Sequence, residues 1–138
     1  MTKVHMSTLL NVPAGEVWDL IGRWNTLPEW HPAVLKSELS EDGQIRRLTL
    51  AGGGVLEERL EQADERRRTY TYEIVSGPLT VSNYKATVSV RDEGSAAAAV
   101  EWSSDFEAHG TSEEEASDII RRIYRDGLDN LKRMFGAP

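Results

Sequence analysis

The distribution of apolar and polar side chains divides this chain into two parts. Between Lys3 and Phe106, short stretches alternate apolar and polar residues, which is the period-two pattern of half-buried strands. From Ser112 to Phe135, apolar residues instead recur three and four positions apart, as on the buried face of an amphipathic helix. The sequence therefore predicts a sheet followed by one long helix.

The alternating stretches are separated by turns that contain glycine, proline and acidic residues. They predict seven strands, at Lys3–Asn11, Val34–Leu39, Ile45–Leu50, Val55–Gln62, Thr69–Val75, Tyr84–Val90 and Ala97–Phe106. Two short helices are expected after the first strand, at Ala14–Ile21 and Leu27–Trp30. Because successive hairpins make a sheet antiparallel, we expect an α+β fold in a single domain over residues 1–138.

Both ends of the long helix are marked in the sequence. Ser112 and Glu115 match a capping box, and acidic residues fill the first turn, where the helix dipole favours negative charge. Lys132 and Arg133 stand near the opposite end, and Gly136 supplies a stop. A helix of this length has a wide apolar face, which the sheet must cover.

The balance of charged residues excludes some classes of function. The net charge is −7, from 16 basic and 23 acidic side chains, which argues against nucleic-acid binding because phosphate contacts need a basic surface. The chain contains no cysteine, so disulfides and thiolate chemistry are excluded. No apolar run approaches the roughly 20 residues of a membrane helix, and the N-terminus lacks the apolar core of a signal peptide. We expect a cytoplasmic protein without membrane insertion, as a monomer or weak homodimer.

Glu58 is the most informative polar position. Leu56, Glu58 and Leu60 share one face of their predicted strand, so the alternation places a carboxylate between leucines. A buried carboxylate is costly unless it is paired, hydrogen-bonded or protonated. Tyr70 and Tyr72 on the adjoining strand are its expected neighbours. Glu58 is therefore a candidate ligand anchor or general acid–base, although a structural Glu–Tyr or Glu–Arg pair, or an outward-facing register, would also explain it.

His31 is the second candidate for acid–base chemistry, since an imidazole with an ordinary pKa near 6.5 can transfer protons. It stands between Trp30 and Pro32, at the end of the second short helix. It could instead face solvent and cap that helix, and we favour this second interpretation. His5 and His109 are isolated, and no histidine spacing matches a metal motif, so no metal or cofactor is expected.

Several other side chains fall on the inward faces of the predicted elements, where aromatic rings can line a cavity and their polar atoms can orient a ligand. Ordinary core packing would give the same pattern. Together with Glu58, the candidate ligand-binding residues are Trp30, Tyr72, Tyr84, Trp102, Ile120 and Tyr124. Gly127 is unusual, since glycine costs about 1 kcal/mol relative to alanine inside a helix; it leaves room for a ligand or a close-packed strand, or marks a kink.

Four segments of the chain resemble the SRPBCC superfamily, whose START-like or Bet v 1-like members have the helix-grip fold. These segments are Val12–Trp18, Leu27–Pro32, Gly77–Val90 and Val100–Trp102. The resemblance covers essentially the whole chain and is greatest to the bacterial polyketide cyclase/dehydrase-like branch. It implies a curved seven-stranded antiparallel sheet wrapped around the C-terminal helix, with the two short helices closing one end of a cavity.

The resemblance also implies a small hydrophobic molecule, lipid-like or polyketide-like, as the occupant of that cavity. Our leading hypothesis is binding without catalysis, because the sequence offers no paired acid–base residues. An alternative is a cofactor-independent enzyme of the cyclase, dehydrase or isomerase kind that uses Glu58 or His31; a second ionisable group in hydrogen-bond reach of Glu58 would favour it. A third hypothesis is a module that binds a protein partner, which a cavity filled by side chains would favour.

Overall fold

The computed structural model describes residues 1–137. Along the chain, the elements are β1 (Thr2–Leu10), α1 (Ala14–Ile21), α2 (Leu27–Trp30), β2 (Val34–Leu39), β3 (Ile45–Leu50), β4 (Val55–Asp64), β5 (Thr69–Ser76), β6 (Val81–Asp92), β7 (Ala98–Ala108) and α3 (Glu113–Phe135). Within residues 1–137, these are the elements that the hydrophobic pattern predicts, in the same order. The largest difference is in β6, which begins at Val81 rather than at Tyr84.

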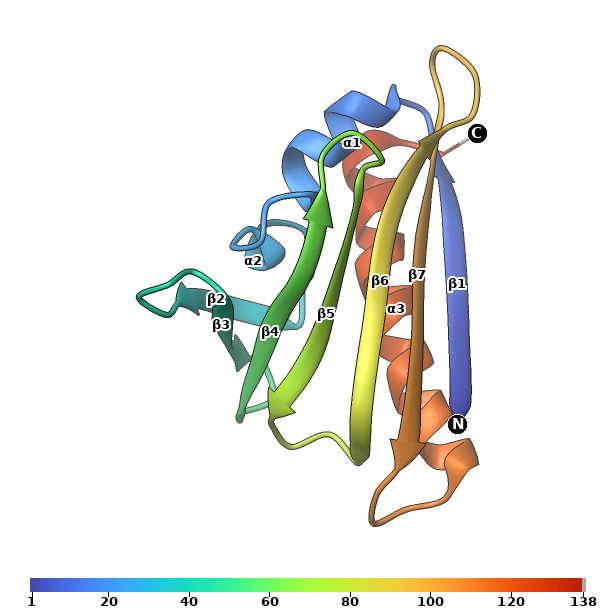
Figure 1. Cartoon of the computed structure of the whole chain (residues 1–138). Coiled ribbons are helices and arrows are strands. Elements are labelled where there is room, and N and C mark those ends of the chain that lie inside the picture. Colours follow the sequence, from blue (N-terminus) through green and yellow to red (C-terminus); the bar gives the residue numbers. More distant parts are fainter. Residues whose placement is uncertain (138) are drawn as a thin grey trace.

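All seven strands of the described chain form one antiparallel sheet, in the order β1-β7-β6-β5-β4-β3-β2. The first strand in the sequence therefore lies beside the last, and β1 and β2 form the two edges. The sheet is strongly curved and folds around α3, which runs along its concave side (Figure 1). This is the helix-grip fold, and the prediction of a curved α+β sheet around a C-terminal helix is confirmed.

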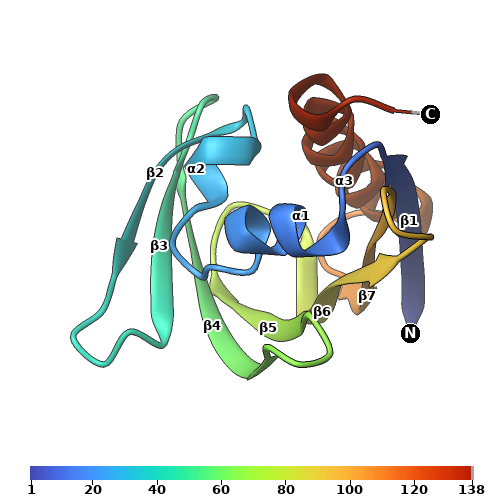
Figure 2. The same cartoon turned by 90° about the horizontal axis from the view of Figure 1, so that it is seen from above.

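The two short helices lie at one end of the concave side. Seen from above, α1 crosses the space that the curved sheet encloses, and α2 stands beside it toward β2 and α3 (Figure 2). α1 is held by its buried apolar residues, among them Val17, Trp18 and Ile21. The space between the outer strands β2–β4 and α3 is left for side chains and, as described below, for a cavity.

The long helix begins and ends where the sequence indicates. The hydroxyl of Ser112 accepts a hydrogen bond from the Glu115 N–H at 3.1 Å, which satisfies one free donor of the first turn. At the other end, Gly136 adopts φ 83° and donates its N–H to the Lys132 carbonyl. Within the described chain, no helix is both long and apolar enough to cross a membrane.

Candidate functional site

A cavity of about 320 Å³ lies between the sheet and α3. This volume is at the small end of the range for small-molecule sites, about 300–1,000 Å³. Its apolar wall includes Leu27, Val34, Leu48, Leu56, Ile74 and Ile120. Four exposed residues also line it, Gly52 and Gly53 in the β3–β4 turn and Arg122 and Asp126 on α3. The cavity therefore opens to solvent between that turn and the helix.

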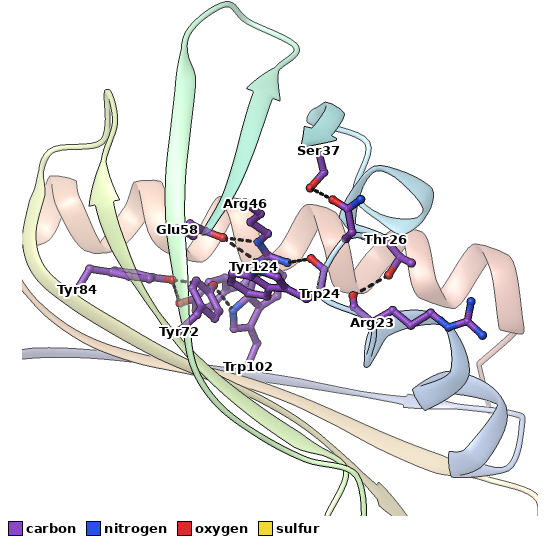
Figure 3. A network of polar contacts seen from close by, with 11 residues as sticks. Arg23, Trp24, Thr26, Ser37, Arg46, Glu58, Tyr72, Tyr84, Trp102 and Tyr124 are labelled. Atoms are coloured by element: carbon purple, nitrogen blue, oxygen red, sulfur yellow. Dashed lines mark hydrogen bonds and ion pairs between the residues drawn. The ribbon is translucent and has the colours of Figure 1, made fainter. Parts of the chain in front are cut away.

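An ion pair is buried in the wall of this cavity. Arg46 on β3 stands directly opposite Glu58 on β4, and the two residues are only 1% and 4% exposed. The Nε of Arg46 donates a hydrogen bond to Oε1 of Glu58 at 2.9 Å, and Nη2 lies 2.7 Å from the same oxygen (Figure 3). Its Nη1 donates to the Trp24 carbonyl, and its guanidinium lies 3.7 Å from the centre of the Trp24 ring. The arginine is thus fixed on three sides.

The ion pair brings two charges into the interior but no net charge. Burial raises the pKa of Glu58 above its ordinary value, and the positive charge of Arg46 opposes that rise. The guanidinium keeps its proton across the physiological range. Arg46 contacts Oε1 of Glu58, whereas Oε2 has no hydrogen-bond partner among residues 1–137.

The prediction that Glu58 faces inward is confirmed. Its partner is an arginine, as in the alternative of a structural Glu–Arg pair. Tyr70 and Tyr72 share the inner face as expected, but bulges in β4 shift the register, and Ile74 rather than either tyrosine stands opposite Glu58. Arg46 was missed. The same alternation would have found it, because Arg46 lies on the face of β3 that carries Leu48.

His31 is buried, at 2% exposed, so the prediction that it faces solvent is wrong. Its Nε2 lies 2.7 Å from the Ile123 carbonyl of α3, and its Nδ1 accepts the Ala33 N–H at 3.1 Å. These partners assign the proton to Nε2. Burial lowers the pKa of His31, against the opposing effects of the Ile123 hydrogen bond and the Asp126 charge. A neutral imidazole with both nitrogens engaged has no free position for proton transfer.

A chain of polar contacts joins the aromatic residues beside the cavity. The Trp102 indole N–H donates to the Tyr72 hydroxyl at 3.0 Å, the Tyr72 and Tyr84 hydroxyls lie 3.3 Å apart, and the Tyr84 hydroxyl contacts that of Tyr124. Figure 3 shows these side chains grouped next to the ion pair. Burial raises the pKa of all three phenols, so each keeps its proton.

The structure brings most of the predicted site residues together. The predicted residues that line the cavity are His31, Glu58, Tyr72, Tyr84, Trp102 and Ile120. Trp30 and Tyr124 are not among its lining residues: both are buried and pack against Trp102, with ring centres 5.5 and 4.2 Å from it. They support the wall, and any direct ligand contact by these two residues stays a prediction.

Gly127 is explained by packing. A β-carbon at this position would lie 2.8 Å from Cδ2 of His31, 3.1 Å from Trp102 and 3.2 Å from Trp30. α3 continues through Gly127 from Glu113 to Phe135, and the glycine lets it approach α2 and β7 closely. Of the interpretations offered by the sequence, close packing is the one that fits. The close neighbours are Trp102 on a strand, Trp30 in α2 and His31, which follows α2.

Residues 1–136 match the protein family described as polyketide cyclase / dehydrase and lipid transport. The chain belongs to this family. Among solved structures, the Bacillus cereus protein XoxI is similar to this family member with a TM-score of 0.95 and 38% identity, covering 98% of this chain and 96% of its own. A START superfamily protein from Mycobacterium smegmatis has the same fold at 13% identity, with a TM-score of 0.80 over 96% of each chain.

A further relative of this family member is the abscisic acid receptor PYL2 of Arabidopsis thaliana. The two are 29% identical over 90 residues, which are 60% of this chain and 47% of the receptor. The chain thus matches about half the length of that relative. The resemblance to the START-like, polyketide cyclase-like branch is confirmed. Because the family description covers both enzymes and lipid transport, membership does not choose between them.

Proposed function

We propose that this protein binds a small apolar molecule in the cavity between the sheet and α3 and holds it without converting it. The observation that carries this proposal is the open cavity of about 320 Å³, whose wall is largely apolar. The few polar groups on that wall, such as Arg46, His31 and Tyr72, already have protein partners. Such a site gains affinity from apolar contact and uses its polar groups to orient the ligand.

The acid–base groups support binding over catalysis. Arg46 is a second ionisable group within hydrogen-bond reach of Glu58, which is the feature expected of an enzyme. However, a guanidinium stays protonated near neutral pH, so Arg46 can neither take up a proton from a substrate nor release one to it. His31 is engaged at both nitrogens. Among the described residues, Glu58 is therefore the one buried carboxylate of the cavity, since Asp126 lies exposed at its opening, and Glu58 has no partner that could return a proton.

That carboxylate is also the observation that favours a second candidate function. Glu58 lines the cavity, and burial raises its pKa toward the range of a general base. A cofactor-independent isomerase or cyclase would use it in this way. If a ligand recovered from the wild-type protein is chemically altered, and the same ligand recovered from Glu58→Gln is not, the enzyme hypothesis replaces binding. A cavity filled by side chains would have favoured the protein-partner hypothesis, and the open cavity does not support it.

The binding proposal is tested by native mass spectrometry of the purified protein together with a thermal-shift screen of neutral apolar compounds. We expect a copurified small molecule or a rise in Tm with at least one compound, because a ligand that binds only the folded state stabilises it. Leu79→Trp, at a half-buried loop residue of the cavity wall, should abolish the shift, whereas Leu35→Trp at an exposed residue elsewhere should not. No copurified molecule and no shift with any compound would contradict the proposal.

Glu58 and its neighbour Glu57 form a matched pair for testing the polar contact. Glu57 points to the other face, where its carboxylate accepts a hydrogen bond from Ser76 at 3.0 Å. We predict that Glu58→Gln weakens a ligand found in the screen and that Glu57→Gln leaves its Kd unchanged. Isothermal titration measures both values, and equal effects of the two substitutions would show that Glu58 does not serve the ligand.

A further inference from the structure

The strand β2 forms an open edge of the sheet. It stands last in the strand order and, within the described chain, pairs with β3 alone. On its other side, the backbone of Leu35–Leu39 has no hydrogen-bond partner among residues 1–137. Figure 2 shows β2 at the outer margin of the molecule. A row of free N–H and C=O groups at a sheet edge is a template for another strand.

The pairing of β2 with β3 shows which backbone groups point away from the sheet. Ser40 donates its N–H to the Ile45 carbonyl of β3. Residues of an antiparallel ladder face the two sides of their strand alternately, so Glu38 also faces β3 and Ser37 faces the open edge. Ser37 is therefore a residue at which two antiparallel copies of β2 can exchange hydrogen bonds around a twofold axis.

The side chains of β2 are complementary to a second copy of the same strand around Ser37. A twofold axis at this residue places Lys36 of each copy opposite Glu38 of the other, and Leu35 opposite Leu39. Opposite charges that face each other across antiparallel strands stabilise their pairing. Leu35 and Leu39 are 63% and 44% exposed, and the same pairing would cover both side chains.

Charged side chains on an edge strand protect it from pairing when like charges would meet. Here the signs alternate instead. Arg47 on β3 stands opposite Glu38, so the order across the joined strands is Arg47, Glu38 and then Lys36 of the second copy. Within one copy, Lys36 Nζ lies 3.6 Å from Glu38 Oε1, but both side chains are more than half exposed, so this pair contributes little by itself.

We propose that β2 pairs with β2 of a second copy of this chain, antiparallel and with the twofold axis at Ser37, so that the two sheets become one. The proposal goes beyond the proposed function, since it concerns assembly and not the occupant of the cavity. A single strand edge is small beside the roughly 1,200–2,000 Å² that stable interfaces bury. The dimer is therefore weak and its population depends on protein concentration.

Sedimentation equilibrium of the full chain, from about 10 µM to about 1 mM, measures this association. We expect the dimer fraction of the wild-type protein to rise over this range. Lys36→Glu leaves two acidic residues on the strand and Glu38→Lys leaves two basic ones. Because the symmetry repeats each contact, either substitution puts like charges together twice, and we expect each to raise the dimer Kd by about 10-fold or more.

Two comparisons separate strand pairing from a general effect of charge. Lys36→Glu makes the net charge of −7 more negative, whereas Glu38→Lys makes it less negative, so general repulsion would move the two Kd values in opposite directions. A mixture of the two variants restores opposite charges at both positions and should associate as the wild-type protein does. Glu107→Lys, at an exposed residue of β7, is the matched control and should leave the Kd unchanged.

Chemical cross-linking tests the register. A carbodiimide joins a lysine directly to a carboxylate, so a mixture of unlabelled and isotope-labelled wild-type protein should yield a mixed-isotope peptide that links Lys36 to Glu38. The pair within one copy gives products of a single isotope only. Mass spectrometry distinguishes the two kinds of product.

Three results would overturn the proposal. The first is a wild-type protein that stays monomeric up to about 1 mM, in which case the charges of β2 only protect the edge. The second is association that Lys36→Glu and Glu38→Lys leave unchanged, and the third is mixed-isotope cross-links that join other residues only. Either of these would place the interface elsewhere. The sedimentation and cross-linking of the wild-type protein need no substitution and no ligand, so they stand apart from the test of the cavity.

Discussion

At the scale of single residues, Gly127 sets how closely α3 approaches the aromatic side chains. The space that a methyl group would need is occupied by His31, Trp102 and Trp30. Helix propensity alone predicts that alanine would stabilise this position by about 1 kcal/mol. Overpacking of a close-packed core costs about 1–3 kcal/mol. The cost of overpacking is at least as large as the gain in helix propensity, so we expect alanine to destabilise the protein.

We therefore predict that Gly127→Ala lowers the free energy of unfolding by up to about 2 kcal/mol. Gly15 in α1 provides the control, because the nearest atom to its added β-carbon would be 4.0 Å away. Gly15→Ala should raise the free energy of unfolding by up to about 1 kcal/mol. Urea denaturation measures both. A stabilised Gly127→Ala variant would show that the neighbours of α3 can move aside.

The buried ion pair gives a second prediction at this scale. Removing one partner, as in Glu58→Leu, leaves an unpaired buried charge and should cost about 3–5 kcal/mol. Replacing both, as in Arg46→Met with Glu58→Leu, should cost little or stabilise, because desolvation of the pair is then removed as well. The raised pKa of Glu58 agrees with this, since burial outweighs its attraction to Arg46.

Urea denaturation of the two single variants and the double variant measures this coupling. Recovery of stability in the double variant would mean that the pair is not required for folding, which favours a role toward the ligand. If the double variant is instead as unstable as the single variants, the pair stabilises the fold relative to apolar side chains and its presence needs no function.

The alternation of side chains placed Glu58 on the inner face, and the same rule applied to β3 would have placed Arg46 there. The alternation does not show how β4 pairs with β5. Bulges at Glu57/Glu58 and between Leu60 and Gln62 move the tyrosines of β5 away from Glu58 and leave Arg46 as its partner. Bulges depend on packing across the whole sheet, so a single strand does not reveal them.

At the scale of elements, His31 ties three parts of the chain together. It lies at the end of α2, donates to the Ile123 carbonyl of α3, and accepts from Ala33, which leads into β2. These links run beside the cavity, which Ala33 and Ile123 also line. The sequence could place His31 after a short helix but not against α3, because their separation along the chain gives no indication of contact.

This link makes stability depend on pH. Burial lowers the pKa of His31 in the folded state below the ordinary 6.5, so the unfolded chain takes up the proton first as pH falls. The stabilisation is therefore complete above about pH 6.5 and is lost as pH falls toward the folded-state pKa, by at most about 1.4 kcal/mol per pH unit. Burial of Glu58 acts in the opposite direction at lower pH.

We predict that the wild-type protein loses stability relative to His31→Gln between pH 7 and pH 5. Glutamine keeps an N–H for the Ile123 carbonyl but does not titrate in this range. Urea denaturation of both proteins at several pH values measures the difference, and effects of Glu58 cancel because both proteins contain it. A difference that does not change with pH would contradict the buried, neutral histidine.

The helix ends and most strand bounds were predictable because capping residues, turns and periodicity are local. The curvature of the sheet came from the family resemblance, whereas the pairing of β1 with β7 was not predicted. Neither follows from local pattern, since β1 and β7 are neighbours in the sheet but are separated along the sequence by the other five strands.

At the scale of the whole molecule, the curved sheet leaves a space that α3 only partly fills. At the α2 end, Trp30, His31 and Trp102 pack against Gly127 and close the core. Toward the β3–β4 turn, the remaining space is the cavity with its mostly apolar wall. Its position between sheet and helix was expected from the resemblance, but its volume and its opening depend on side-chain packing that no sequence pattern specifies.

The central claim is that this cavity takes up a small apolar molecule. The chain contains six isoleucines, of which Ile74, Ile119, Ile120 and Ile123 line the cavity and Ile21 and Ile45 do not. The most direct measurement is a methyl NMR spectrum of isoleucine-labelled protein during titration with dimethylaminonaphthalene, a neutral apolar compound. We predict saturable shifts of the four lining methyl groups and unchanged signals from Ile21 and Ile45. Unchanged signals from all six, or equal shifts of all six, would contradict binding in this cavity.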